Sequence, residues 1–199
     1  MGSNTFKIKM KCYKKSIKNV IGNKNNTIGL KQGVVKLQPY NIEWEKDFKK
    51  EKGALGKMLG DVALDIQHVG STAIYGMIAK PIIDINIAIK HLGIIDDLIK
   101  PLEKLGYRYH GGEPGKRLFL KGLENNITHH LFIIELDSDF WRNDLLFRDY
   151  LRKNKDVAQQ YANLKQGLVE KFYNNRTSYS EGKSNFIETV LNKAKDFTC

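Results

Sequence analysis

The chain has 199 residues, 41% of them hydrophobic, and a net charge of +11, a composition typical of one globular domain. No apolar run approaches the roughly 20 residues that cross a bilayer, and the lysine-rich amino terminus lacks the apolar core of a secretory signal. Cys12 and Cys199 have no Cys or His neighbours at metal-ligand spacing. The sequence therefore excludes a zinc ribbon and a disulfide scaffold, and it predicts a cytoplasmic protein with no membrane partner.

The positive charge is concentrated at one end of the chain. Residues 1–27 contain seven lysines and no acidic residue, so they contribute +7 and leave +4 (11 − 7) for the rest. A short basic arm attracts nucleic acid by counterion release, although a solvated extension has the same composition. We predict a basic extension over residues 1–27, dispensable for folding, and one domain over residues 28–196. Nucleic acid is expected as a partner only through the arm.

The first half of the domain predicts one helix and two strands. Trp44, Phe48 and Leu55 recur at helical spacing and predict a helix near residues 41–60. Residues 62–69 alternate in polarity and end at a glycine turn, which favours a strand. Residues 82–89 (IIDINIAI) form a second predicted strand, with isoleucines on one face and Asp84, Asn86 and Ala88 on the other.

The second half begins with a predicted helix over residues 93–104 and ends in further helices. Between them, short extended runs at 106–110 and 116–122 precede a predicted strand at 127–136, with a hairpin turn at residues 124–126. Strands followed by a helical tail indicate an α+β fold: a small mixed sheet with flanking helices and a helical C-terminal segment.

Residues 69–86 (VGSTAIYGMIAKPIIDIN) contain the most informative pattern. A strand, a Gly-Ser turn, a short helix and a second strand bearing an aspartate form a layout that holds a nucleoside triphosphate. Asp84 and Asn86 project from one face of the strand and can share Mg²⁺. The amide of Asn86 brings no negative charge, so metal affinity should be lower than with two aspartates. The alternative is a purely structural turn.

The same segment resembles the GrpB family, a group of bacterial proteins placed in the DNA polymerase beta-like nucleotidyltransferase superfamily. The resemblance begins with HVGSTAIYGMIAKPIIDI at residues 68–85 and extends over about residues 28–195. Its other motifs follow in the expected order: KLQPYNIEWEKDF at 36–48, GYRYHGGE at 106–113, THHLF at 128–132, LLFRDYLR at 145–152, YANLK at 161–165 and YSEGKSNFI at 179–187. The resemblance implies a nucleotidyltransferase-like fold.

The resemblance also implies roles for individual residues. It places Gly70, Ser71 and Thr72 at a phosphate-binding turn, Asp84 at the catalytic and metal position, and Lys80 near the phosphates. Further basic residues match positions that would contact nucleotide: Arg117, Arg148, Lys165 and Lys183. For each cation the alternative is a solvated surface charge, and Arg148 can equally pair with its neighbour Asp149.

Two adjacent histidines lie on the third strand. Neighbouring strand residues face opposite ways, so only one of His129 and His130 can face a given cleft. The resemblance selects His130 as a base or nucleotide contact, and the alternative is a half-buried histidine bonded to a carbonyl.

Three departures from the family pattern concern metal binding and proton transfer. Asn86 replaces a second carboxylate, Phe132 replaces a second histidine and Tyr75 replaces a proline.

Two functions remain open at this point. The first is nucleotide binding with Mg²⁺-dependent nucleotidyl transfer from a nucleoside triphosphate to an unknown acceptor. The second is a catalytically silent accessory or folding module, like the domain appended to dephospho-coenzyme A kinase in some relatives. The chain has no GxxxxGK[ST] loop, so it is not that kinase itself.

Overall fold

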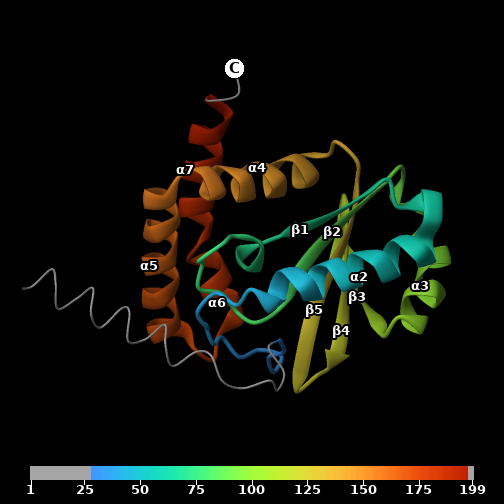
Figure 1. The fold of residues 1–199 in the computed structure, drawn as a ribbon, viewed down its shortest axis with the longest axis horizontal. Coiled ribbons are helices and arrows are strands. Elements are labelled where there is room, and N and C mark those ends of the chain that lie inside the picture. Colours follow the sequence, from blue (N-terminus) through green and yellow to red (C-terminus); the bar gives the residue numbers. More distant parts are fainter. Residues whose placement is uncertain (1–27, 197–199) are drawn as a thin grey trace, which may run out of the picture.

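The computed structural model describes residues 28–196, in which five strands form one sheet and helices cover its two faces (Figure 1). The predicted extension, residues 1–27, lies outside the described residues. The strands are β1 (Asp65–Val69), β2 (Ile83–Ile89), β3 (Tyr107–Glu113), β4 (Lys116–Leu123) and β5 (Asn126–Glu135). The α-helices are α2 (Glu43–Leu59), α3 (Ile95–Lys104), α4 (Asp139–Lys153), α5 (Lys155–Phe172), α6 (Arg176–Glu181) and α7 (Ser184–Asp196).

The sheet has the strand order β1-β2-β5-β4-β3 and is mixed. Strands β2 and β5 pair in parallel, and the other neighbours are antiparallel. The parallel pairing sets Asp84 directly opposite His130, so both side chains lie on the same face of the sheet. The predicted α+β fold class, with a small mixed sheet and a helical C-terminal segment, is therefore confirmed.

One face of the sheet carries the main hydrophobic core. The isoleucines at 83, 85, 87 and 89 are buried against α2 and α3, together with Leu131 and Ile133 of β5. Helix α2 begins where the side chain of Asn41 accepts a hydrogen bond from the Glu43 amide, and its Trp44 and Leu55 are fully buried. This packing fixes the position of β2, and the opposite face of that strand is free to present polar groups.

The helices after the sheet cover the opposite, polar face (Figure 1). Trp141 of α4 packs on Ala88 and Ile134, which closes one end of that face. Ser138 precedes α4 and its hydroxyl accepts a hydrogen bond from the Trp141 amide, which fixes where the helix begins. Helices α4, α5 and α7 share a second core around Leu151, Tyr161 and Val190. The C-terminal helices are thus packed over the strand that bears Asp84.

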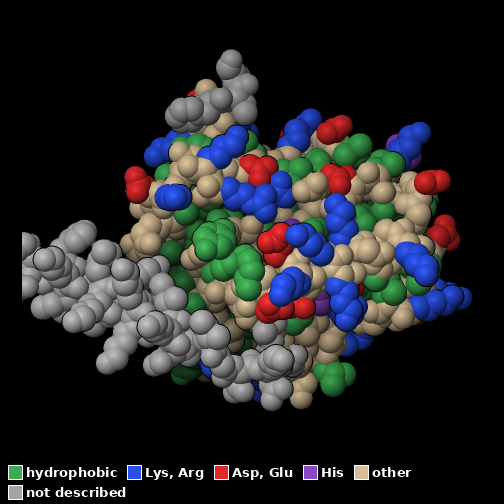
Figure 2. Space-filling view, viewed as in Figure 1, with side chains coloured by type: hydrophobic (Ala, Val, Ile, Leu, Met, Phe, Trp, Pro, Cys, Tyr) green, Lys and Arg blue, Asp and Glu red, His purple; other side chains and the backbone are tan. Residues whose placement is uncertain are grey.

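The surface of the described residues shows no single strongly basic region on the face drawn in Figure 2, where Lys and Arg side chains are interspersed with Asp and Glu. No helix of residues 28–196 is long and apolar enough to cross a membrane.

Candidate functional site

A cavity of about 270 Å³ lies between the polar face of the sheet and helices α4 to α6. It is lined by most of the site residues that the sequence predicts, although these residues are spread over more than 110 positions of the chain. Those that line it are Gly70, Ser71, Thr72, Lys80, Asp84, His130, Lys165 and Lys183. Residues that the sequence analysis did not single out also line the cavity, among them Lys116, Asp144, Tyr161, Arg176 and Tyr179.

The glycine turn brings the backbone against Asp84. Gly70 has φ 68° and ψ −170°, a conformation open essentially to glycine alone. A Cβ at this position would lie 2.4 Å from Asp84 Oδ2. Only glycine leaves room here for the Asp84 carboxylate to lie against the turn. The sequence pattern did not reveal this requirement.

Asp84, His130 and Arg176 form a chain of hydrogen bonds on one wall of the cavity. His130 Nδ1 lies 2.8 Å from Asp84 Oδ1, and Arg176 Nη2 lies 3.2 Å from His130 Nε2. Because Arg176 is always a donor, Nε2 must accept, and the proton of the neutral ring is on Nδ1 and is donated to Asp84.

The charges of this pair follow from their surroundings. Burial lowers the pKa of His130, more than the adjacent carboxylate raises it. Burial alone would raise the pKa of Asp84, but the hydrogen bond from His130 and the positive charges of Lys80 and Arg176 hold it below its usual value. The structure therefore contains a neutral histidine and an ionised aspartate.

Three lysines that are buried or half-buried also line the cavity: Lys80, Lys165 and Lys183. Lys165 is 2% exposed, lies over the Tyr161 ring and donates to the Ser71 hydroxyl at 2.9 Å and to the Ile78 carbonyl. Burial, with the charges of Lys183 and Lys80, lowers the pKa of Lys165 to about 7. Burial and the charge of Arg176 lower the pKa of Lys80 to about 8. Such crowding of cations indicates a site for an anion.

Lys183 completes this group from the segment before α7. Its ammonium lies 4.8 Å from the centre of the Tyr179 ring, and the ammonium of Lys80 lies 5.9 Å from the same ring. Burial and the charge of Arg176 lower the pKa of Lys183. The Tyr179 ring thus stabilises two cations by cation–π contact.

Three predicted residues do not line the cavity. Arg117 donates to the carbonyls of Glu113 and Lys116 at the edge of the sheet. Arg148 is 8% exposed and pairs with Asp149 as the alternative reading proposed, while its Nη1 also holds Gln67 and the His68 carbonyl. Asn86 is fully buried, and its amide nitrogen donates to Asp144 Oδ2 at 2.8 Å.

Of the paired histidines, His130 faces the cavity and His129 faces the α2 side of the sheet. His129 is 5% exposed, lies near the Tyr107 ring and hydrogen-bonds through Nδ1 to Thr128 Oγ1. Thr72 is also held internally: its hydroxyl bonds to His68 Nε2 at 3.0 Å and to the Ile82 carbonyl at 3.4 Å. The Thr72 hydroxyl therefore stabilises the turn through hydrogen bonds within the protein.

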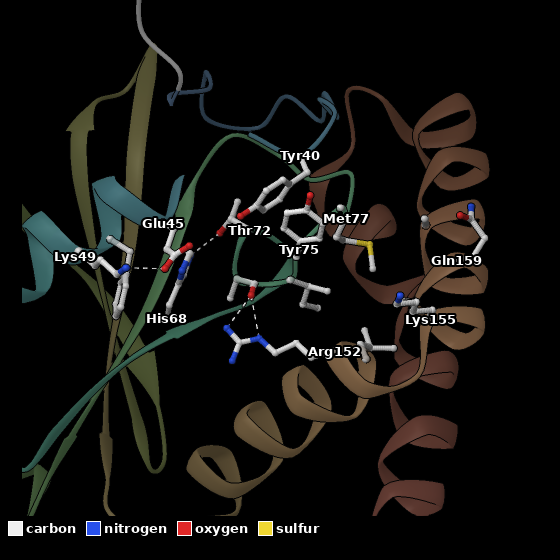
Figure 3. Close-up of a pocket in the computed structure, with 17 residues that line it drawn as sticks. Tyr40, Glu45, Lys49, His68, Thr72, Tyr75, Met77, Arg152, Lys155 and Gln159 are labelled. Atoms are coloured by element: carbon white, nitrogen blue, oxygen red, sulfur yellow. Dashed lines mark hydrogen bonds and ion pairs between the residues drawn. The ribbon is translucent and has the colours of Figure 1, made fainter. Parts of the chain in front are cut away.

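A second cavity, of about 640 Å³, lies on the other side of residues 71–77, between α2, α4 and α5 (Figure 3). The rings of Tyr40 and Tyr75 lie 5.1 Å apart at this cavity, and Tyr75 is 84% exposed. Arg152 donates two hydrogen bonds to the Ala73 carbonyl from below the loop. Although it is larger, this cavity is lined by only one of the predicted site residues, Thr72, so we place the candidate site in the smaller one.

The comparisons with known proteins agree with this architecture. The family model for GrpB protein matches residues 34–193. The chain belongs to the GrpB family. It is 38% identical over 173 residues to the glutamate-rich protein GrpB of Alkalihalophilus pseudofirmus, which covers 83% of this chain and 99% of that protein. The crystal structure of GrpB from Enterococcus faecalis matches with a TM-score of 0.75 and 32% identity over 82% of this chain and all of that chain.

A more distant relative is a larger protein. The dephospho-CoA kinase of Mycolicibacterium paratuberculosis is 26% identical over 193 residues, which cover 82% of this chain and 46% of the kinase. The GrpB-like region is therefore about half of that protein.

Proposed function

We propose that this GrpB-family chain binds a nucleoside triphosphate in the cavity at the Gly70 turn. The observation that carries the proposal is the convergence of five cations on a cavity with two carboxylates: Lys80, Lys116, Lys165, Arg176 and Lys183 against Asp84 and Asp144. With all of these ionised, the lining has a charge of +3 (5 − 2), because His130 is neutral. A polyphosphate supplies the missing negative charge and enough acceptor oxygens for these donors.

The size of the cavity favours the phosphate chain as the part that is enclosed. Its volume of about 270 Å³ lies just below the roughly 300–1,000 Å³ typical of small-molecule pockets. We therefore expect the base and ribose to extend beyond the enclosed volume.

Of the two residues predicted to hold Mg²⁺, Asp84 lines the cavity and Asn86 does not. Asp84 uses Oδ1 for His130, and Asn86 Oδ1 is buried without a hydrogen-bond partner in the described part of the chain. Carboxylate and amide oxygens are the ligands that Mg²⁺ prefers. Bound at Asp84, Mg²⁺ would neutralise the triphosphate and polarise the phosphorus for attack by an acceptor hydroxyl. Asp84 would hold the ion, the lysines would orient the phosphates, and His130 would keep Asp84 in position.

The experiment that tests nucleotide binding is calorimetric titration with ATP, first in EDTA and then with Mg²⁺. We expect binding in both, because the cations belong to the protein. Lys183→Gln should weaken the affinity about tenfold or more, because a charge-assisted hydrogen bond contributes roughly 1.5–3 kcal/mol. Lys171→Gln, on an exposed turn of α5, is the control and should leave the affinity unchanged. Wild-type protein that binds neither ATP nor GTP would refute the proposal.

The second candidate is a silent accessory module, favoured by the match to about half of a dephospho-CoA kinase. Such a module keeps the fold without needing a ligand. Thermal melting separates the two, because a ligand at 100 times its dissociation constant adds about 2.7 kcal/mol of stability. No shift with either triphosphate would favour the accessory role.

A further inference from the structure

The larger cavity, of about 640 Å³, is lined by aromatic rings from different parts of the chain. The rings of Tyr40 and Tyr75 lie 5.1 Å apart, and those of Phe48 and His68 are stacked with their centres 4.6 Å apart. The volume lies within the roughly 300–1,000 Å³ typical of small-molecule pockets, which are mostly lined by apolar and aromatic side chains. This cavity therefore has the size and the lining for a planar aromatic ligand.

Tyr75 keeps most of its surface in contact with solvent at the edge of this cavity. It is 84% exposed although its ring contacts that of Tyr40. An exposed tyrosine has a large ring face available for stacking, and it loses little side-chain entropy when a ligand covers it. In Figure 3 the two tyrosine rings lie between Glu45 and Lys49 of α2 on one side and Lys155 of α5 on the other. A ligand stacked on Tyr75 would therefore lie among charged groups from both helices.

The charged groups that line the cavity leave one cation without a counter-charge. Lys49 Nζ lies 2.7 Å from Glu45 Oε1. Arg152 Nη1 lies 3.3 Å from Asp149 Oδ1, just outside the lining. Lys155, the first residue of α5, is exposed and forms no ion pair within 4.0 Å among residues 28–196. With the two pairs formed, one positive charge remains at this cavity, on Lys155.

We propose that the larger cavity is a second ligand site, which binds a planar aromatic molecule with a single carboxylate group. Tyr75 stacks on the aromatic part, and Lys155 pairs with the carboxylate. One free cation suits a monoanion, whereas the charge of +3 at the smaller cavity suits a polyphosphate. His68 meets the ligand as a neutral ring, because burial lowers its pKa to about 4. The site does not depend on the proposed nucleotide binding.

The probe that tests the site is 2-naphthoate, titrated with the full chain at pH 7 and followed by ligand-observed NMR. Neutral 2-naphthalenemethanol and cationic 2-naphthylmethylammonium have the same rings, and we expect the affinity to fall in that order. Tyr75→Ala should weaken 2-naphthoate binding about two- to tenfold, the loss expected for one aromatic contact, and Tyr75→Phe should retain the affinity. Lys155→Gln should weaken 2-naphthoate several-fold and leave 2-naphthalenemethanol unchanged.

Each variant has a matched control outside the cavity. Tyr173→Ala removes another exposed tyrosine, and Lys153→Gln removes an exposed lysine two positions before Lys155. Neither residue lines the cavity, so neither change should alter the affinity for 2-naphthoate. Thermal melting shows that each variant is folded. Wild-type protein that does not bind 2-naphthoate, or Tyr75→Ala that binds it as tightly as Tyr173→Ala, would overturn the proposal.

The smaller cavity also attracts anions, so the experiment must show which cavity holds the probe. Lys183 lines the smaller cavity alone, and Lys183→Gln should therefore leave 2-naphthoate binding unchanged. Binding that is weakened by Lys183→Gln and not by Tyr75→Ala would place the probe in the smaller cavity and overturn the proposal. ATP binding should be the same in Tyr75→Ala as in the wild type, so either proposal can fail while the other stands.

Discussion

Gly70 shows how one residue sets the geometry of the site. Its positive φ and the 2.4 Å approach that a Cβ would make to Asp84 Oδ2 are two separate demands on the same position. The first concerns the backbone and the second concerns the carboxylate. The two demands can be separated by experiment.

We expect Gly70→Ala to destabilise the protein by more than the roughly 1–3 kcal/mol that a strained backbone conformation costs, because Asp84 must also be displaced. Gly76→Ala is the matched control, since Gly76 has φ 77° and open space around its Cα. Urea unfolding gives the free energies. In a double-mutant cycle, Asp84→Ala should reduce the cost of Gly70→Ala. Equal costs at positions 70 and 76 would show that the carboxylate plays no part.

At the residue scale, the sequence was most informative where polar residues occupy alternating positions of a strand, because alternation determines which face a side chain is on. The alternation of residues 82–89 correctly placed Asp84 on the polar face, and the opposed orientation of His129 and His130 correctly left one of them facing the cavity. Asp144 and Arg176 were missed because each lies on a helix with no local motif. Their positions at the cavity depend on how the helices pack against the sheet. The helical repeat of 3.6 residues per turn predicts which residues share a helix face, but not where that face packs.

Helix α4 controls the loop between the two cavities through Arg152. This side chain donates from Nε at 3.1 Å and from Nη2 at 2.8 Å to the Ala73 carbonyl, and from Nη1 to Asp149. A guanidinium makes such paired bonds, whereas an ammonium cannot reproduce their geometry. The turn that lines the smaller cavity is thus held from its far side.

Arg152 does not line the smaller cavity. We nevertheless expect Arg152→Lys to make residues 71–78 more mobile, because the hydrogen bonds to the Ala73 carbonyl are lost. We expect faster amide hydrogen exchange in that loop and a several-fold loss of ATP affinity, in line with about 1 kcal/mol for a lost hydrogen bond. Arg142→Lys is the control, because Arg142 is largely exposed and pairs only loosely with Asp139 at 3.6 Å. Unchanged exchange in Arg152→Lys would mean that the loop is fixed by other contacts.

At the element scale, the predicted strands and helices match the structure within a few residues, and the differences have local causes. The predicted strand at 62–69 begins at Asp65, because residues 60–62 form a 3-10 turn after α2. The helical tail divides into four helices at Asn154, near Asn175 and near Gly182. Asn175 shows why one of these breaks occurs, because its side chain accepts a hydrogen bond from the Ser178 amide and so starts a new helix.

For the molecule as a whole, the proposed binding of a polyphosphate would be coupled to the protonation of the buried lysines. Burial lowers the pKa of Lys165 to about 7 and that of Lys80 to about 8, so near pH 8 both are partly uncharged in the free protein. A bound polyphosphate favours the charged form and must raise both pKa values. Binding therefore takes up protons, and the affinity should fall as pH rises from 7 to 9.

Titration of ATP in EDTA at pH 8, in buffers with different ionisation enthalpies, measures this uptake. We expect on the order of one proton per ATP, the sum of the two partial changes. Lys165→Met should reduce the number, because it removes the group with the lowest pKa. An enthalpy independent of the buffer would show that the lysines do not change protonation on binding.

The cavity joins two parts of the chain that are made at different times. Residues 70–84 and 130 leave the ribosome well before Lys165, Arg176 and Lys183, and only the docked C-terminal helices bring the two sets together. A partly synthesised chain would have the turn and Asp84 without Lys165, Arg176 and Lys183, three of the five cations to which we assign the proposed ligand binding. We therefore expect ligand binding only in chains that have been synthesised beyond residue 183 and have folded.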